Sequence, residues 1–144
     1  MDNKSATPAN QSSANQHSKN NNDDKNNIKN KTAYKKLRVL IHFLYSPKGV
    51  TEKSINEAAR VMSGRNYPTY IQREHDILLA YPVLRKQDKE NSYYSIYQLK
   101  NAEQAHKLVD LIIHHCKRFE LTCIDEVAMR LLADKFPDRG EVAA

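Results

Sequence analysis

The chain has 144 residues and a formal net charge of +6 at pH 7, a length that suits one domain with additional segments. No apolar run approaches the roughly 18 residues that a membrane span needs, and no apolar segment follows the first lysine as in a secretory signal. The two cysteines fit neither a disulfide framework nor a zinc pattern, so we expect a cytoplasmic protein without a membrane span.

Residues 1–30 have the composition of a disordered tail. They contain nine asparagines, and their only large apolar side chains are Met1 and Ile28. Such a stretch buries too little apolar surface to offset the entropy of ordering it. We therefore expect a disordered, Asn-rich tail and a folded region that begins near Lys31.

The positive charge is concentrated in residues 31–100. This segment carries thirteen Lys and Arg against six Asp and Glu, a net of +7, whereas residues 101–144 carry six against eight, a net of −2. A basic patch confined to one unit favours a polyanionic partner, because phosphate contacts release condensed counterions. A solubilising surface is the alternative, and Lys35, Lys36 and Lys89 fit it.

Three short amphipathic helices are predicted in the basic segment. The first spans 32–45, where apolar residues recur every three or four positions. The second begins at Thr51 as N-cap and ends at Gly64. The third has Pro68 in its first turn and breaks before Pro82. The residues expected to point inward are Tyr34, Leu37, Leu40, Ile41 and Leu44, then Ile55, Ala58, Ala59 and Met62, then Ile71, His75 and Leu78, with Ile77 nearby.

A β-hairpin and two further helices follow. Strand-favouring residues on both sides of the polar turn QDKENS predict a hairpin over 83–99. Asn101 should cap a long helix, and a second amphipathic helix should end at Pro137. This is more apolar surface than the small unit needs, so the two helices either cap the core or form a dimer interface, which we favour. Their expected apolar faces are Leu108, Leu111, Ile112, Cys116 and Phe119, and Ile124, Val127, Ala128, Leu131 and Leu132.

The outward positions of the third helix are the main functional candidates. Gln72 can offer its amide to adenine, and Arg73 can contact guanine or a phosphate. Arg65 and Asn66 could fix a phosphate together with free N–H groups of the helix. Basic side chains beside tyrosines on the hairpin suit phosphate contacts, although ordinary surface polarity is the alternative for every position. The candidate DNA-binding residues are Arg65, Asn66, Thr69, Tyr70, Gln72, Arg73, Arg85, Lys86, Lys89 and Tyr93.

Other chemistries find little support. Adjacent helical residues such as His114 and His115 point about 100° apart, which is poor for joint metal ligation. Cys116 and Cys123 would lie about two turns apart, too far to share a zinc ion unless the helix breaks between them. The chain lacks a Gly-rich phosphate loop, and residues 74–76 spread around a helix. We therefore expect no enzymatic activity, no metal and no cofactor.

Segment 33–99 resembles the winged helix-turn-helix superfamily, in particular its small members encoded by bacteriophages and other mobile elements. The resemblance rests on GVTEKSINEAARVMSG leading into RNYPTYIQREHDIL, followed by VLRKQ and SYYSIYQL as wing strands. It implies a mostly α fold with a small β-hairpin wing, in which helix 68–79 enters the major groove of double-stranded DNA. The chain departs from the usual pattern at Tyr81-Pro82, where many such domains have glycine.

Four segments are thus predicted: a disordered tail over 1–30, a winged helix-turn-helix domain over 31–100, a C-terminal helical extension over 101–137 and a frayed end over 138–144. We expect a sequence-specific DNA-binding transcriptional regulator of bacterial or mobile-element genes, which forms a homodimer through its C-terminal helices. Two other functions stay open: a protein-interaction adaptor or inhibitor on the same scaffold, and a replication or partition accessory DNA-binding protein.

Overall fold

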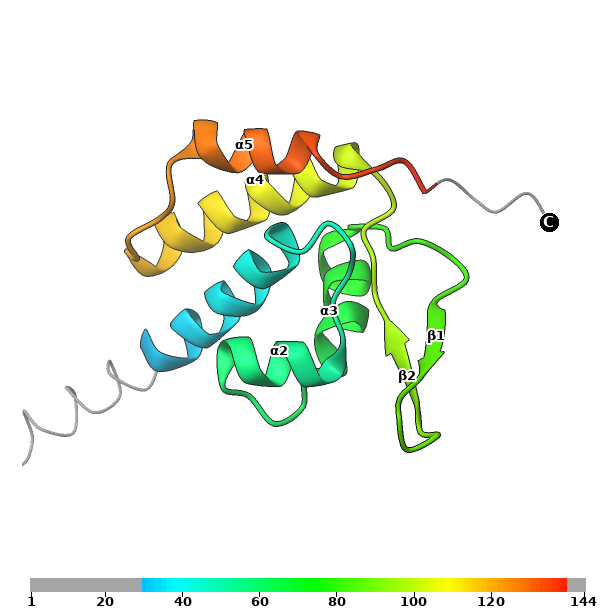
Figure 1. The fold of residues 1–144 in the computed structure, drawn as a ribbon. Coiled ribbons are helices and arrows are strands. Elements are labelled where there is room, and N and C mark those ends of the chain that lie inside the picture. The colour runs from blue at the N-terminus through cyan, green and yellow to red at the C-terminus, as the bar shows by residue number, and fades with distance from the viewer. Residues whose placement is uncertain (1–29, 140–144) are drawn as a thin grey trace, which may run out of the picture. The chain divides into compact units, whose positions relative to one another are not determined.

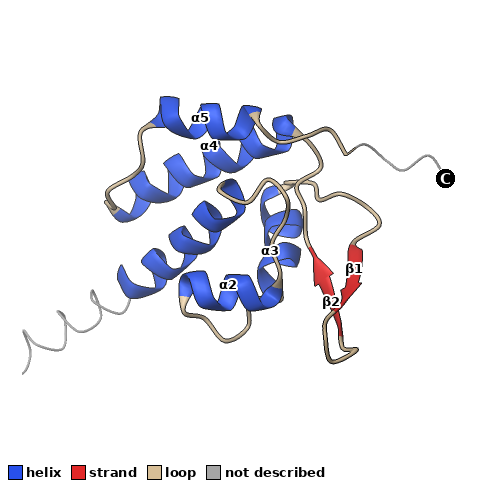
Figure 2. Cartoon of the chain, viewed as in Figure 1, coloured by secondary structure: helices blue, strands red, loops and turns tan. Residues whose placement is uncertain are grey.

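The structure is a computed structural model that describes residues 30–139. The predicted tail, apart from residue 30, and residues 140–144 of the predicted frayed end lie outside this range. Within it the chain is mostly helical and carries a two-stranded antiparallel hairpin, as Figures 1 and 2 show. The prediction of a mostly α fold with a small β-hairpin is therefore confirmed.

Among the described residues the first helix covers 30–44, and it ends one residue before its predicted end. Its buried face is broader than the predicted stripe. Val39 and Phe43 are buried although neither belonged to that stripe, whereas Tyr34 is 42% exposed and Ile41 is only half-buried. The spacing of apolar residues along one helix does not show how many neighbouring elements pack against that helix. Here the buried face covers a wider arc of the helix than the predicted apolar stripe.

Helix α2 (Glu52–Ala59) begins where the sequence predicted. The hydroxyl of its N-cap, Thr51, accepts the N–H of Ser54 at 3.0 Å, and the Ser54 hydroxyl accepts the N–H of Thr51 at 2.9 Å. This capping box satisfies two N–H groups that have no partner within the helix. The predicted end is wrong, because Arg60 takes the left-handed conformation at φ 55° and stops the helix there. Ala58 is exposed rather than inward-facing.

Gly64 does not end α2 as predicted. A Cβ there would lie 2.9 Å from the Glu52 carbonyl oxygen and from Ile55 Cβ, so glycine permits the turn to approach the helix closely. The Gly64 N–H also donates to Asn56 Oδ1 at 2.7 Å. Because α2 stops early, Met62 lies beyond it and is 93% exposed instead of buried.

Helix α3 (Asn66–His75) is shorter than predicted. Pro68 lies in its first turn, as expected, and is buried together with Ile71. The helix stops because Asp76 adopts φ 54° and the next N–H, that of Ile77, bonds to the Ile71 carbonyl at 3.2 Å. A non-glycine residue in the left-handed region thus ends the helix well before Pro82, which the sequence had marked as the break.

The chain leaves α3 through a contact with α4 (Ala102–Phe119). The N–H of Leu78 donates at 2.8 Å to the side-chain oxygen of Gln104, which is buried. Leu78, predicted to point inward, is 41% exposed because the helix has already ended. Asn101 caps α4 as predicted, and its side-chain oxygen accepts the N–H of Gln104 at 3.0 Å.

The hairpin consists of β1 (Leu84–Gln87) and β2 (Tyr93–Ile96), inside the predicted segment. Val50 extends the pairing on the side of β2 away from β1. It forms a bridge with Tyr97, in which each residue donates its N–H to the carbonyl of the other at 2.8 and 2.7 Å. The segment that precedes α2 is therefore attached to the hairpin.

Helix α5 (Glu126–Asp134) lies along α4 (Figure 1). Arg130 joins the two helices. Its guanidinium donates to the His106 carbonyl at 3.1 Å and to the Asp110 carboxylate at 2.5 Å. It also bonds Glu126 within α5 at 3.1 Å, so the orientation of α5 on α4 is held by several charge-assisted bonds.

The apolar faces of both C-terminal helices differ from the predicted ones. In α5, Met129 and Ala133 are buried, whereas Val127 and Leu131 are 66% and 60% exposed. Because α5 is apolar on more than one side, periodicity could not decide which side meets α4. Of the other predicted positions, Ala128 is exposed, Leu132 is half-buried in α5, and Ile124 is half-buried in the segment before α5. In α4, Leu111 and Phe119 are half-buried, and Leu108, Ile112 and Cys116 are buried as predicted.

The last described residues are anchored. Phe136 is buried. Arg139, which the sequence assigned to a frayed end, donates its backbone N–H to the Lys100 carbonyl at 2.7 Å and its guanidinium to the Pro47 carbonyl at 2.8 Å. Two segments distant in sequence therefore hold Arg139 in place.

Candidate nucleic-acid interface

One side of α3 presents the predicted base-reading side chains. Pro68 and Ile71 are buried and determine which side faces the core. Thr69, Gln72 and Arg73 are exposed on the remaining surface. Within the described part of the chain, the side chains of Gln72 and Arg73 have no hydrogen bond or ion pair. Their amide and guanidinium groups can therefore bind a ligand without breaking contacts of the fold.

The start of α3 offers side chains, and the first two N–H groups of the helix are already paired. Arg65 and Asn66 are exposed there. The N–H of Asn66 donates to the Ser63 carbonyl at 3.0 Å, and the N–H of Tyr67 donates to the Gly64 carbonyl at 3.1 Å. The predicted use of free helix N–H groups for a phosphate is therefore wrong, because the preceding turn already occupies them. A phosphate contact at this end would have to come from side chains.

Tyr70 is half-buried, and the prediction that it points away from the fold is wrong. Its hydroxyl accepts a hydrogen bond from the Lys36 ammonium and lies 2.9 Å from His75 Nε2. Lys36 Nζ is also 4.3 Å from the centroid of the Tyr70 ring, a cation–π contact. Tyr70 thus links α3 to the first helix, and its partner Lys36 could not be identified from the local pattern of α3.

Burial lowers the pKa of both basic groups in this cluster. Burial lowers the pKa of Lys36, the nearby Arg118 lowers it further, and Glu74 opposes the shift. Burial is also the main cause that lowers the pKa of His75, with Lys36 as the next cause. A neutral His75 keeps a ring nitrogen available for the Tyr70 hydroxyl at neutral pH.

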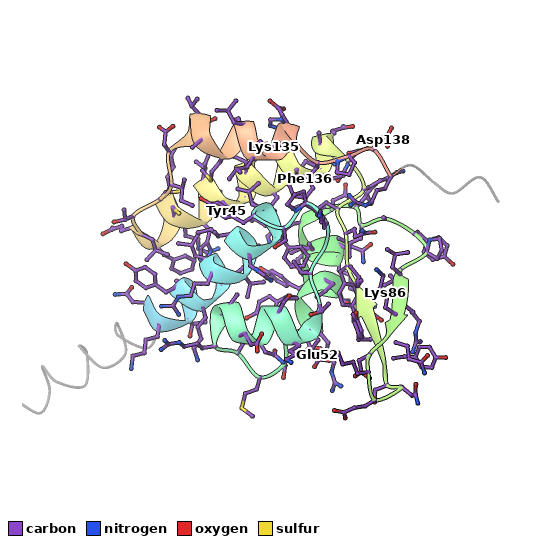
Figure 3. The ribbon with its side chains drawn as sticks, viewed as in Figure 1. Tyr45, Glu52, Lys86, Lys135, Phe136 and Asp138 are labelled. Carbon is purple, nitrogen blue, oxygen red and sulfur yellow. The ribbon has the colours of Figure 1, made fainter. Side chains whose placement is uncertain are left out.

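The hairpin carries the second set of candidates, and all of them are exposed. Successive strand residues point to opposite faces, so Arg85 and Lys86 present their charges on different faces of β1. Figure 3 shows Lys86 on this strand. The Arg85 guanidinium carbon lies 5.6 Å from the centroid of the Tyr93 ring on β2, and Lys89 lies in the connecting turn. The hairpin therefore offers cations on both faces and at its tip.

The structure thus gathers the exposed candidates on two elements. We call the residues on α3 and just before it the α3 group and those on the hairpin the hairpin group. The α3 group is Arg65, Asn66, Thr69, Gln72 and Arg73, and the hairpin group is Arg85, Lys86, Lys89 and Tyr93.

A groove of about 600 Å³ between the start of α2 and strand β2 escaped the sequence-based predictions. We call it the β2 groove. Segments about forty positions apart form it, so no local pattern could indicate it, and the clearest structural link between them is the bridge of Val50 with Tyr97. Its lining residues are Thr51, Glu52, Lys53, Asn56, Asp88, Tyr93, Tyr94, Ser95 and Tyr97.

The helix breaks between Cys116 and Cys123, the alternative that the sequence left open. Helix α4 ends at Phe119, and Glu120 adopts φ 54°, so Cys123 lies beyond the end of the helix that holds Cys116. Burial and the neighbouring Cys123 thiol raise the pKa of Cys116 to about 12, so its thiol stays protonated at neutral pH. Residues 30–139 contain no group of three or more side chains suited to bind a metal ion.

No helix in the described range combines the length and apolar character that crossing a membrane requires. No protein-family model matches the chain, and neither the curated proteins nor the solved structures include a significant match.

Proposed function

We propose that the protein is a sequence-specific DNA-binding transcriptional regulator of the winged helix-turn-helix type, encoded by a bacterium or a mobile element. The element order supports this proposal: the first helix, the bridged Val50, α2, a short turn, α3 and then the β-hairpin. The observation that carries it is the side of α3 that holds Gln72 and Arg73, which is exposed, polar and without partners in the described fold.

In this proposal the two groups have different roles. Gln72 has the donor and acceptor pair that matches adenine, and Arg73 has the paired donors that match guanine, so the α3 group reads bases in the major groove. The hairpin group contacts phosphates and positions the protein without reading sequence. The net charge of +7 over residues 31–100 supplies the salt-dependent part of the affinity.

We further propose that the protein is a homodimer and that its C-terminal helices form the interface. The exposed side chains of Val127 and Leu131 lie one turn apart on α5, and Arg130 holds this helix firmly on α4. Burying such a stripe against a second copy removes apolar surface from water. Leu131→Glu should shift the molar mass measured by light scattering from dimer to monomer, whereas Thr122→Glu, at an exposed polar position, should not.

Selection of bound fragments from a genomic library, at low and at physiological salt, tests the DNA-binding proposal. We expect a small set of fragments with a shared motif, bound more weakly as salt rises. Binding without sequence preference would leave only a nonspecific DNA-binding protein. Absence of binding even at low salt would refute the proposal and favour the adaptor function.

A further inference from the structure

We propose that the β2 groove is a docking site for an extended peptide segment of another protein, which pairs with the open edge of β2. This inference goes beyond the proposed DNA contact, because it concerns the backbone edge of β2 and a different class of partner, although Tyr93 belongs to both the hairpin group and the groove lining. A regulator with such a site could contact a protein while its α3 and hairpin groups contact DNA.

The first support is a vacant strand position beside β2. Val50 pairs with Tyr97 in the antiparallel sense, so a continuing strand would place Glu52 opposite Ser95. The chain instead enters α2 at Glu52 and leaves the sheet. Figure 3 labels Glu52 at this end of α2. The position next to the first half of β2 therefore has no strand, and the β2 groove occupies it.

The second support is the direction of the backbone groups of β2. The Asp88 N–H donates to the Ser92 carbonyl at 2.9 Å, so these two residues form a hydrogen-bonded pair across the hairpin. Along an antiparallel ladder, hydrogen-bonded pairs alternate with pairs that are not hydrogen-bonded. By this alternation the N–H and C=O groups of Tyr93 and Ser95 point away from β1. Tyr97, two residues further along, uses the same side to bond Val50. Tyr93 and Ser95 thus present an unpaired edge to the groove.

The groove has room for a short strand. Its far wall is the start of α2, and its volume is about 600 Å³. A segment of roughly three or four extended residues could exchange about four backbone hydrogen bonds with Tyr93 and Ser95. Strand addition of this kind obtains affinity from main-chain bonds and specificity from the side chains beside them.

The chemistry of the groove favours a peptide over nucleic acid. The edge of β2 offers both N–H donors and carbonyl acceptors. A phosphodiester carries only acceptors, so a bound phosphodiester would leave the β2 carbonyls unpaired. Glu52 and Asp88 also line the groove, against the single ammonium of Lys53. Thr51 and Asn56 make the wall polar. The occupant that fits is an extended segment with short polar side chains and no net negative charge.

Ser95→Pro tests the proposal, with Gln87→Pro as the matched control. The N–H of Ser95 makes no bond to β1, so proline there removes a groove-facing donor and leaves the hairpin ladder intact. Gln87 lies opposite Tyr93 in another pair that is not hydrogen-bonded. The N–H of Gln87 therefore points to the outer edge of β1, so proline there also spares the ladder but leaves the groove unchanged. The probe is a phage-displayed library of random heptapeptides panned on the full chain.

We expect enriched peptides that bind the unmodified protein, bind Ser95→Pro about tenfold more weakly, and bind Gln87→Pro equally well. Hydrogen exchange in the unmodified protein gives a readout that needs no variant: a bound peptide should slow exchange of the Tyr93 and Ser95 amides. Failure to enrich any peptide, or enriched peptides that leave both amides unprotected, would overturn the proposal. DNA binding is measured separately, so either proposal can fail alone.

Discussion

Arg73→Ala is the most direct test of base reading by α3. Arg73 is exposed and has no partner among the described residues, so the substitution should change the free energy of unfolding by less than about 0.5 kcal/mol. A bidentate contact with guanine contributes about 1–3 kcal/mol. At about 1.4 kcal/mol per tenfold change, the selected site should be bound about 5- to 150-fold more weakly, while binding to random DNA should be nearly unchanged.

Lys86→Ala provides the contrast. One lysine that neutralises a phosphate contributes about 0.9 to the slope of log affinity against log salt concentration. Between 50 and 200 mM salt, the loss of this contact should therefore reduce the salt effect by about three- to fourfold. Lys86→Ala should weaken binding to the selected site and to random DNA by the same factor, because phosphates carry no sequence information.

Fluorescence anisotropy with a labelled duplex that contains the selected site, and with a random duplex of equal length, measures both effects over a salt series. Arg38→Ala is the control, because Arg38 is an exposed arginine outside the α3 and hairpin groups. An equal loss on both duplexes for Arg73→Ala would make Arg73 a phosphate contact. No loss on either duplex would remove α3 from the interface and refute the reasoning.

Three predictions concern the fold that presents α3. Ile71→Ala, at a fully buried position, should lower the free energy of unfolding in urea by about 2–5 kcal/mol, and a loss below 1 kcal/mol would show that α3 packs loosely. Thr51→Ala should cost about 1 kcal/mol by breaking the capping box, whereas Thr51→Ser should retain most of it. Burial lowers the pKa of His75 in the fold, so the unfolded chain binds more protons as pH falls. Stability in urea should therefore decline as pH drops through the ordinary histidine value of about 6.5, and His75→Gln should flatten this decline.

Local chemistry made several element boundaries predictable. Thr51 and Asn101 accept N–H groups only three residues away, and Pro68 needs nothing beyond its own ring to suit a first helical turn. The polar turn between the strands is likewise formed within five residues, where Asp88 Oδ1 accepts the N–H groups of Glu90 and Ser92. Each of these interactions is complete within a short window of sequence.

Helix ends without such signals were not predictable. Arg60, Asp76 and Glu120 end their helices in the left-handed conformation, although none is glycine. Because glycine is preferred at such positions, the sequence predicted that α2 ends at Gly64. Gly64 instead allows the turn after α2 to approach that helix closely. The cost of a left-handed arginine or aspartate is small enough for packing elsewhere to outweigh it, so the residue type alone does not locate the end.

The sequence by itself determined a basic unit of short helices followed by a hairpin, because amphipathic periods, caps and turn residues act over a few positions. Only the tertiary structure decided which side of α5 meets α4, that Tyr70 is held by Lys36, and that β2 keeps an open edge beside α2. These features join residues far apart in the chain, and the balance between alternative apolar faces or partners depends on what the rest of the fold brings alongside them.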